Sequence, residues 1–326
     1  MLQKTIISFL LFLFLVSCNS NKDSKVLRLA HGLPVSHPTH LSLEKFAEDV
    51  AERSNGKLRI KIYPSEQLGS ERDCLELLQI GSLDLSKVSA ATLGNFDNRF
   101  TVFSLPYLME NKKHRYQFFE SELAQRFLNG LSQFKLKGLT FYDAGCRNFY
   151  SSTPIRNSQD LAGMKIRVMK NPKPIEMVNA LGGSATPISF GELYSALQQG
   201  VVDGAENNPS SFYSSKHYEL CKHYTLDEHL STPDLVIMSQ KTWDKLNDEE
   251  QKWIGEAIYD SHFYQRKKWD DTEIEIMEKL VDVGVTIYEI DKTEFMNLTA
   301  SMYDKDVIGQ SMFDLVAEIK ALANEK

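Results

Sequence analysis

The sequence predicts an α/β protein with two lobes and one unusually long helical segment. Apolar residues recur with a period of two in short stretches and with helical spacing in the longer stretches between them, which is typical of a parallel-type sheet. The 326 residues exceed the length at which a single core usually stops growing, so two lobes are expected. Roughly 35 residues after Asn247 contain no proline and only one glycine, Gly255, whereas an average helix has ~11 to 12 residues.

The first elements after the N-terminal segment form a strand, a helix and a second strand. Leu27 and Leu29 alternate with polar neighbours, as in a strand with one buried face. Residues 40–56 then place apolar side chains at helical spacing and end in a glycine, and residues 57–62 alternate again. This order is the basic unit of a parallel sheet.

Capping residues predict where the next helix begins and ends. Ser70, with Asp73 three residues later, is expected to begin a helix, and Gly81 to end it. Residues 83–90 follow as another strand.

A second capping pattern lies further along the chain. Ser189 and Glu192 match an S-x-x-E capping box for a helix that Gly200 would end. The long segment after Asn247 forms either one continuous helix or two ordinary helices that meet near residues 269–271.

The N-terminus indicates export from the cytoplasm. The apolar run at 6–16 is shorter than the ~20 residues of a transmembrane helix and fits the core of a signal peptide. The sequence at 15–18, Leu-Val-Ser-Cys, matches a lipoprotein cleavage site, so Cys18 is the expected lipidation site. Residues 1–17 would then be the signal peptide and 18–25 a lipid-anchored tether. An ordinary secretory peptide cut elsewhere is the alternative.

The remaining cysteines are Cys74, Cys146 and Cys221. Their odd number and the absence of a C-x-x-C motif argue against a disulfide scaffold and a structural zinc site. We expect three small buried apolar side chains, and one disulfide pair remains an alternative. No cofactor and no metal are expected.

The formal net charge of −7 bears on the class of ligand. Without a basic run or interleaved aromatic and basic residues, nucleic acid is not an expected partner. An acidic protein also repels anions at long range, so an anionic ligand has to be captured by local arginines.

Two arginines are candidates for that capture, Arg147 and Arg167. Arg167 lies between Ile166 and Val168 in a short strand, and its side chain is therefore expected on the opposite face from theirs. The guanidinium group is permanently charged, and its fork of donors matches a carboxylate. Taken alone, each arginine is better explained by a structural ion pair with an acidic neighbour.

Four motifs occur in a defined order along the chain. They are YPSEQLGSE at 63–71, GSLDL at 81–85, GMKIRV at 163–168 and the run ALGGSATPISFGELYSALQQGVVDGAENNP at 180–209. Together they resemble the extracytoplasmic solute-binding subunit of TRAP transporters, the DctP-like family. The resemblance runs from about Val26 to the C-terminus.

This resemblance implies a two-lobed periplasmic-binding-protein fold in which one continuous long helix crosses both lobes. The first lobe would comprise residues 26–144 and 233–272. The second lobe would comprise residues 145–232 and 273–326.

The resemblance also implies roles for individual residues. Arg167 corresponds to the main carboxylate-binding arginine of the family, Arg147 to a second basic contact, and Asn207 to an amide that faces the ligand. Phe190 resembles the aromatic residue that packs on the ligand's carbon skeleton, with a core contact as the alternative. Glu71 matches an acidic contact to hydroxyl groups, with a favourable charge in a helix's first turn as the alternative.

Three further residues are expected near the ligand. His31 ends the first strand and would lie near the cleft between the lobes. Glu206 precedes Asn207 in the same strand, and Asp234 follows a proline near the crossing between lobes.

The function implied is the capture of a small organic acid for the membrane subunits of a TRAP transporter, in the periplasm, from a lipid anchor. The AENN sequence at 205–208 resembles members that take uronic or other sugar acids, such as a hexuronate. Ser89 stands where members that bind sialic acid carry a glutamate, which argues against sialic acid. With no P-loop, transport would be driven by an ion gradient across the membrane subunits.

Two other function classes remain open from the sequence, a ligand-sensing lipoprotein and an enzyme acting on acidic sugars. The enzyme would need two carboxylates across a scissile bond, and Asp203 and Glu206 are the obvious pair. Because they lie three residues apart in one strand, they point to opposite faces. We therefore expect a binding protein and not an enzyme.

Overall fold

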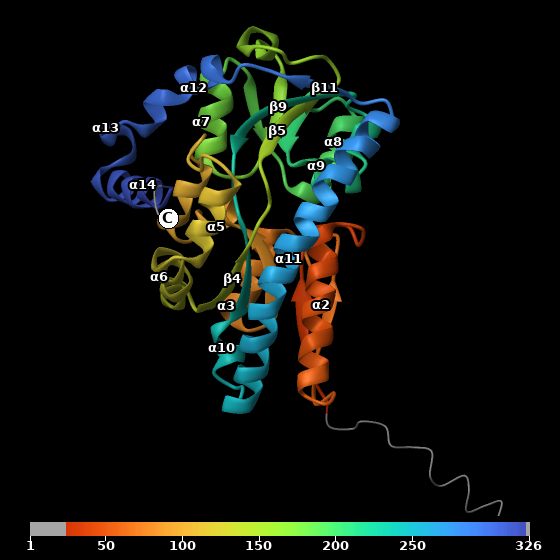
Figure 1. Cartoon of the computed structure of the whole chain (residues 1–326), viewed down its shortest axis with the longest axis vertical. Coiled ribbons are helices and arrows are strands. Elements are labelled where there is room, and N and C mark those ends of the chain that lie inside the picture. The colour runs from red at the N-terminus through yellow and green to blue at the C-terminus, as the bar shows by residue number, and fades with distance from the viewer. Residues whose placement is uncertain (1–23, 324–326) are drawn as a thin grey trace, which may run out of the picture.

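A computed structural model of the chain describes residues 24–323, and it confirms the predicted two-lobed α/β fold (Figure 1). Each lobe is built around one sheet. In the first lobe β1 is parallel to its two neighbours, and β10 enters antiparallel from the second half of the chain. The strands of this sheet, in spatial order, are β2 (Leu58–Tyr63), β1 (Lys25–Ala30), β3 (Leu85–Ser89), β10 (Asp234–Ser239) and β4 (Leu136–Tyr142).

The second lobe holds a six-stranded sheet of mixed direction. Strands β6, β7 and β8 are parallel, whereas β5 runs antiparallel between β8 and β9. In spatial order the strands are β11 (Thr286–Glu289), β9 (His223–Leu230), β5 (Arg147–Ser151), β8 (Gly204–Asn207), β6 (Lys165–Val168) and β7 (Ser184–Pro187).

Helices and short 3-10 turns (η) connect these strands. Those that precede β5 are α2 (Pro38–Arg53), α3 (Glu71–Ile80), α4 (Ala90–Leu93), η1 (Asn98–Ser104), α5 (Lys112–Glu120), α6 (Glu122–Gly130) and η2 (Leu131–Phe134). Those between β5 and β10 are η3 (Ser158–Leu161), α7 (Pro172–Ala180), η4 (Phe190–Glu192), α8 (Leu193–Gln198), α9 (Pro209–Ser214) and η5 (His217–Glu219). Those after β10 are α10 (Gln240–Trp243), α11 (Asp248–Asp282), α12 (Thr293–Thr299), η6 (Ala300–Tyr303), α13 (Lys305–Ile308) and α14 (Gln310–Leu322).

The expected first strand, helix and second strand are confirmed as β1, α2 and β2, with β1 and β2 parallel. The capping box at Ser70 also forms as expected. Its hydroxyl accepts from the amide of Asp73, whose carboxylate accepts from the amide of Ser70. Gly81 ends this helix in the left-handed conformation, with φ of 78°, which glycine adopts without steric cost.

The second capping pattern behaves differently from the prediction. The chain after Ser189 first forms the 3-10 turn η4, and the helix α8 begins only at Leu193. The Ser189 hydroxyl donates to the Glu192 carboxylate and accepts no backbone amide. The extra turn leaves Phe190 ahead of the helix, where it lines the cavity described below.

The long segment is one continuous helix, α11, of 35 residues. Asn247 and Glu250 form its N-terminal capping box. The helix packs on α2 and β4 of the first lobe and on α9 of the second, and Figure 1 shows it passing along both lobes. The alternative of two helices that meet near 269–271 is therefore wrong, because Trp269 in this stretch is buried as part of an unbroken helix.

The C-terminal helix α14 differs from the expected division of the lobes. It packs against α5 and η1, which belong to the first lobe (Figure 1). A hydrogen bond of 2.8 Å joins the His114 side chain to the backbone oxygen of Ile319. The end of the 273–326 segment thus returns to the first lobe, because its apolar face is buried there.

Cys74 and Cys221 are buried, Cys146 is half-buried, and all three are free thiols. Within residues 24–323, no helix combines the length and apolar character needed to cross a bilayer. The expected lipidation site, Cys18, lies outside the described residues.

Candidate ligand-binding site

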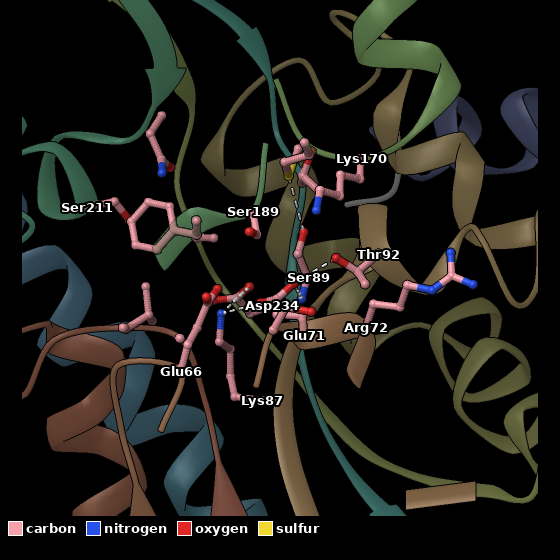
Figure 2. A pocket seen from close by; sticks show the side chains of 18 of the residues that line it. Glu66, Glu71, Arg72, Lys87, Ser89, Thr92, Lys170, Ser189, Ser211 and Asp234 are labelled. Atoms are coloured by element: carbon pink, nitrogen blue, oxygen red, sulfur yellow. Dashed lines mark hydrogen bonds and ion pairs between the residues drawn. The ribbon is translucent and has the colours of Figure 1, made fainter. Parts of the chain in front are cut away.

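A cavity lies between the two lobes, with walls from both sheets (Figure 2). Its empty space is about 950 Å³, including solvent at the mouth, which is in the range of small-molecule sites. The first lobe contributes segments that follow β1 and β2 and the end of β3, and the second contributes β6 and the end of β8. Ligand sites of open α/β sheets commonly lie at these carboxyl ends.

Arg167 lies in the wall of this cavity and has no acidic partner in its immediate contacts. Its Nε donates to the backbone oxygen of Ile188 at 2.8 Å. Its Nη1 is buried and makes no hydrogen bond, although only 3% of the residue is exposed. Burial lowers the pKa of this guanidinium from its ordinary value, but an arginine side chain remains charged in proteins. The wall thus holds a desolvated cation that pairs with no carboxylate of residues 24–323.

Arg147 also lines the cavity, but its charge is already paired. Nε and Nη2 donate to the Glu206 carboxylate, and Nη1 donates to Asn207 Oδ1 at 2.9 Å. The sequence analysis considered a structural ion pair with an acidic neighbour for each arginine. Arg147 forms such a pair, with Glu206, and Arg167 does not. The Asn207 oxygen also accepts from the backbone amide of Asn208 at 2.9 Å. The side-chain nitrogen of Asn207 makes no hydrogen bond among residues 24–323.

Glu206 does not reach the cavity wall. It is fully buried behind Arg147, with an exposed fraction of 0%. Its place near the ligand was expected because it precedes Asn207, but alternation along β8 sends the two side chains to opposite faces. Asp203, the other half of the hypothetical catalytic pair, does not line the cavity either and accepts from the amide of Lys165 at 2.8 Å.

A buried chain of charges continues behind Glu206. His229 Nδ1 lies 2.6 Å from Asp227 Oδ2, and its Nε2 lies 3.6 Å from Glu206 Oε2. Although burial alone lowers the pKa of His229, the two carboxylates outweigh it and raise this pKa to about 9. Burial likewise raises the pKa of Glu206, but Arg147 and His229 lower it to about 2. Two cations and two anions therefore alternate in the second lobe, and no sequence pattern indicated His229 or Asp227.

This chain of charges predicts how stability depends on pH. Because the folded-state pKa of His229 lies above its ordinary value, its contribution is fully present below ~6.5 and is lost as the pH rises through about 9. We expect the free energy of unfolding to fall by on the order of 1 to 3 kcal/mol over this window. In the variant His229→Gln this decrease should disappear, as measured by urea denaturation at several pH values.

A control variant on the same strand is His223→Gln. This side chain is half-buried and bonds to the Tyr288 hydroxyl at 2.8 Å, and burial lowers its pKa. The His223→Gln variant should keep the decrease in the free energy of unfolding above pH 6.5. Identical pH profiles for the wild type and His229→Gln would contradict the assignment of a charged imidazole.

The first-lobe wall is organised around Lys87, which the sequence analysis did not select. Figure 2 shows its amine beside the carboxylates of Glu71 and Asp234, at 3.0 and 3.2 Å. Both carboxylates line the cavity. Lys87 stands within the strand LDLSKVSA, and a charged residue in a buried strand is the signal that would have found it.

His31, like Glu206, is an expected site residue that does not line the cavity. It is 2% exposed, lies outside the cavity wall, and its Nε2 bonds to His40 Nδ1 at 2.9 Å. The chain turns after β1, so that His37 lines the cavity instead. His37 caps α2 by accepting from the amide of Thr39.

Phe190 lies at the boundary between the cavity and the core of the second lobe. It lines the cavity, with its ring 5.9 Å from the Arg167 guanidinium carbon, and it also packs against the apolar core of the second lobe.

Contacts across the cavity hold the lobes together. The Glu66 carboxylate lies against the backbone of Gly191 on the other lobe, where a side chain at Gly191 would collide with it. His37 Nε2 lies 3.2 Å from Ser211 Oγ on the other lobe. Within residues 24–323 no group of three metal-ligating side chains is found. The cavity thus lies between lobes that are in direct contact, and its wall carries the Arg167 cation.

Comparison with known proteins identifies the family. The model of the bacterial extracellular solute-binding proteins of family 7, DctP, matches residues 29–310. The chain belongs to this family. A solute-binding protein of Chromohalobacter salexigens is 34% identical over 276 residues, 84% of this chain and 82% of that one.

Solved structures of TRAP periplasmic solute-binding proteins have the same fold. One from Xanthobacter autotrophicus Py2, with bound β-D-galacturonate, has a TM-score of 0.87 and 36% identity and covers 90% of this chain and 99% of its own. One from Pseudomonas putida F1, with bound D-glucuronate, has a TM-score of 0.88 and 34% identity and covers 92% and 98%. The predicted resemblance is confirmed, and this solute-binding protein is of the TRAP type.

Proposed function

We propose that this TRAP solute-binding protein captures a hexuronate in the cavity between its lobes. The observation that carries the proposal is the buried Nη1 of Arg167, which has no hydrogen-bond partner within the described part of the chain, residues 24–323. A buried charge without a partner is costly, and a ligand carboxylate would remove this cost by accepting from the guanidinium fork. The galacturonate and glucuronate in the two similar structures support a sugar acid as the source of that carboxylate.

The neighbouring side chains would orient the ligand. Asn207 presents an amide nitrogen without a partner, and the remaining Nη1 hydrogen of Arg147 is available beside it. Phe190 offers an apolar face to the carbon skeleton. Glu206 lies behind the wall, so we propose that it acts only by holding Arg147 in place. His31 also lies behind the wall, and we assign no ligand contact to it.

Binding would stabilise the closed lobes, because contacts to the ligand come from both walls. The closed protein would then be recognised by the membrane subunits of the transporter. We also propose a periplasmic protein that is lipid-anchored through Cys18, on the basis of the N-terminal sequence. The family and its structural neighbours are solute-binding proteins, and Asp203 and Glu206, the carboxylate pair considered for a glycosidase, do not line this cavity, so we propose no catalytic activity.

Thermal shift and calorimetry of the purified protein test this function. D-glucuronate and D-galacturonate should raise the unfolding midpoint, since a ligand at 100 times its Kd adds ~2.7 kcal/mol to stability. Sialic acid, C4-dicarboxylates and 2-oxo acids serve as the comparison set. A stronger shift with any of these, or no shift with either uronate, would contradict the proposal.

A further inference from the structure

The two walls of the cavity carry opposite charge. On the second-lobe wall Arg167 has no ion-pair partner among residues 24–323, Lys170 is an exposed cation, and the charge of Arg147 is balanced by Glu206. On the first-lobe wall three carboxylates line the cavity around the single buried amine of Lys87. These carboxylates belong to Glu66, Glu71 and Asp234. Arg72 also lines the cavity, but its exposed charge is balanced by Glu76 at 3.1 Å and its side chain points away from the three carboxylates in Figure 2.

The hydrogen bonds of this wall determine what it still lacks. Glu71 has both oxygens engaged, one by Lys87 and the other by the amide of Ser89 and the hydroxyl of Thr92, at 3.1 and 2.7 Å. It is a structural anion and offers little to a ligand. Asp234 uses only Oδ1, toward Lys87, and its Oδ2 has no partner among the described residues. The open position on this wall is therefore a hydrogen-bond acceptor.

The charge of Lys87 does not make this wall attractive to anions. Lys87 is 3% exposed, and two carboxylates already surround its amine. Burial and the nearby Glu71 charge together raise the pKa of Asp234 to about 6, against the opposing effect of Lys87. Glu66 behaves similarly, since burial raises its pKa. The wall thus holds more negative charge than its one cation balances.

We infer that the first-lobe wall, with Asp234 as its open acceptor, is a specificity filter that accepts hydroxyl donors and rejects a second carboxylate. This inference rests on the proposed function, in which Arg167 takes the first carboxylate. The substrate class is then a polyhydroxy monocarboxylate. A dicarboxylate of the same length would bring its second carboxylate against Asp234 and Glu66, where like charges in a desolvated site oppose binding.

Two acyclic acids of equal length separate these cases. D-galactonate and galactarate share the carboxylate at C1 and the hydroxyl groups at C2 to C5, and differ only at C6, which is a hydroxymethyl group or a carboxylate. We expect galactonate to bind at least ~100-fold more tightly than galactarate, as measured by displacement of bound D-glucuronate. Asp234→Asn should reduce this ratio at least ~10-fold, and Glu66→Gln provides a second variant if Asp234→Asn does not fold.

Glu176→Gln is the matched control. Glu176 pairs with Lys173 on the second lobe and lies outside the cavity, so its loss of one negative charge should leave the ratio unchanged. Equal affinity for the two acids, or no binding of galactonate, would overturn the filter. If D-glucuronate still binds in that case, the proposed function stands. Failure of both uronates to bind would instead overturn the proposed function.

Discussion

Replacing Arg167 with methionine is expected to abolish uronate binding and, at the same time, to raise the stability of the ligand-free protein. The buried guanidinium has one hydrogen bond from Nε to a backbone oxygen and a buried Nη1 without a partner. An apolar side chain of similar length removes this uncompensated charge, and such replacements are often neutral or stabilising. The ligand carboxylate, however, loses the fork that would bind it.

The conservative variant separates charge from geometry. Arg167→Lys keeps a cation but has no planar fork, so binding should weaken by roughly 1.5 to 3 kcal/mol, the range for hydrogen bonds to charged groups. Calorimetry with D-glucuronate measures the affinity, and thermal unfolding without ligand measures the stability.

Lys170→Met is the control for this experiment, because it removes an exposed cation from the same wall. Its effect on affinity should stay below ~1 kcal/mol, as for other exposed charges. Wild-type affinity in Arg167→Lys would exclude the proposed carboxylate clamp. A ligand-free Arg167→Met protein that unfolds several degrees earlier would show that the guanidinium is structural.

The second large effect is expected at Glu206, which touches no ligand in our proposal. Glu206→Gln should lower the free energy of unfolding by about 3 to 5 kcal/mol, as is typical when one partner of a buried ion pair is removed. Arg147 would lose its carboxylate partner, and the imidazole of His229 would retain only Asp227. Urea denaturation at pH 7 measures the loss.

Loss of uronate affinity should accompany this change, because Arg147 is no longer held in place. A double variant, Glu206→Leu with Arg147→Met, tests the cause: it removes both charges and should recover part of the stability but not the binding. If Glu206→Gln instead unfolds at the wild-type urea concentration, the buried network has no structural role.

Local sequence signals determined most of the framework. The first strand, helix and second strand followed from hydrophobic period, and the ends of α3 and the start of α11 followed from capping residues. These features depend on neighbours a few residues apart, which a sequence displays directly. Arg167 was found because its motif and its strand position are both local, and its lack of an acidic partner agrees with its expected role.

The sequence did not determine which side chains meet across the cavity. Lys87 and Asp234 are separated by 147 positions, and His37 and Ser211 by 174. His31 was expected where His37 is found, because the turn after β1 decides which histidine faces the cleft.

The same limit explains the remaining differences. Glu206 pairs with Arg147 through the register of β5 with β8, and α14 returns to the first lobe because α5 and η1 cover its apolar face. By itself, the sequence determined the fold class, the family and the arginine in the wall. The charge pattern of both walls was decided only by the tertiary structure, because strand register and lobe closure bring distant residues within hydrogen-bonding distance.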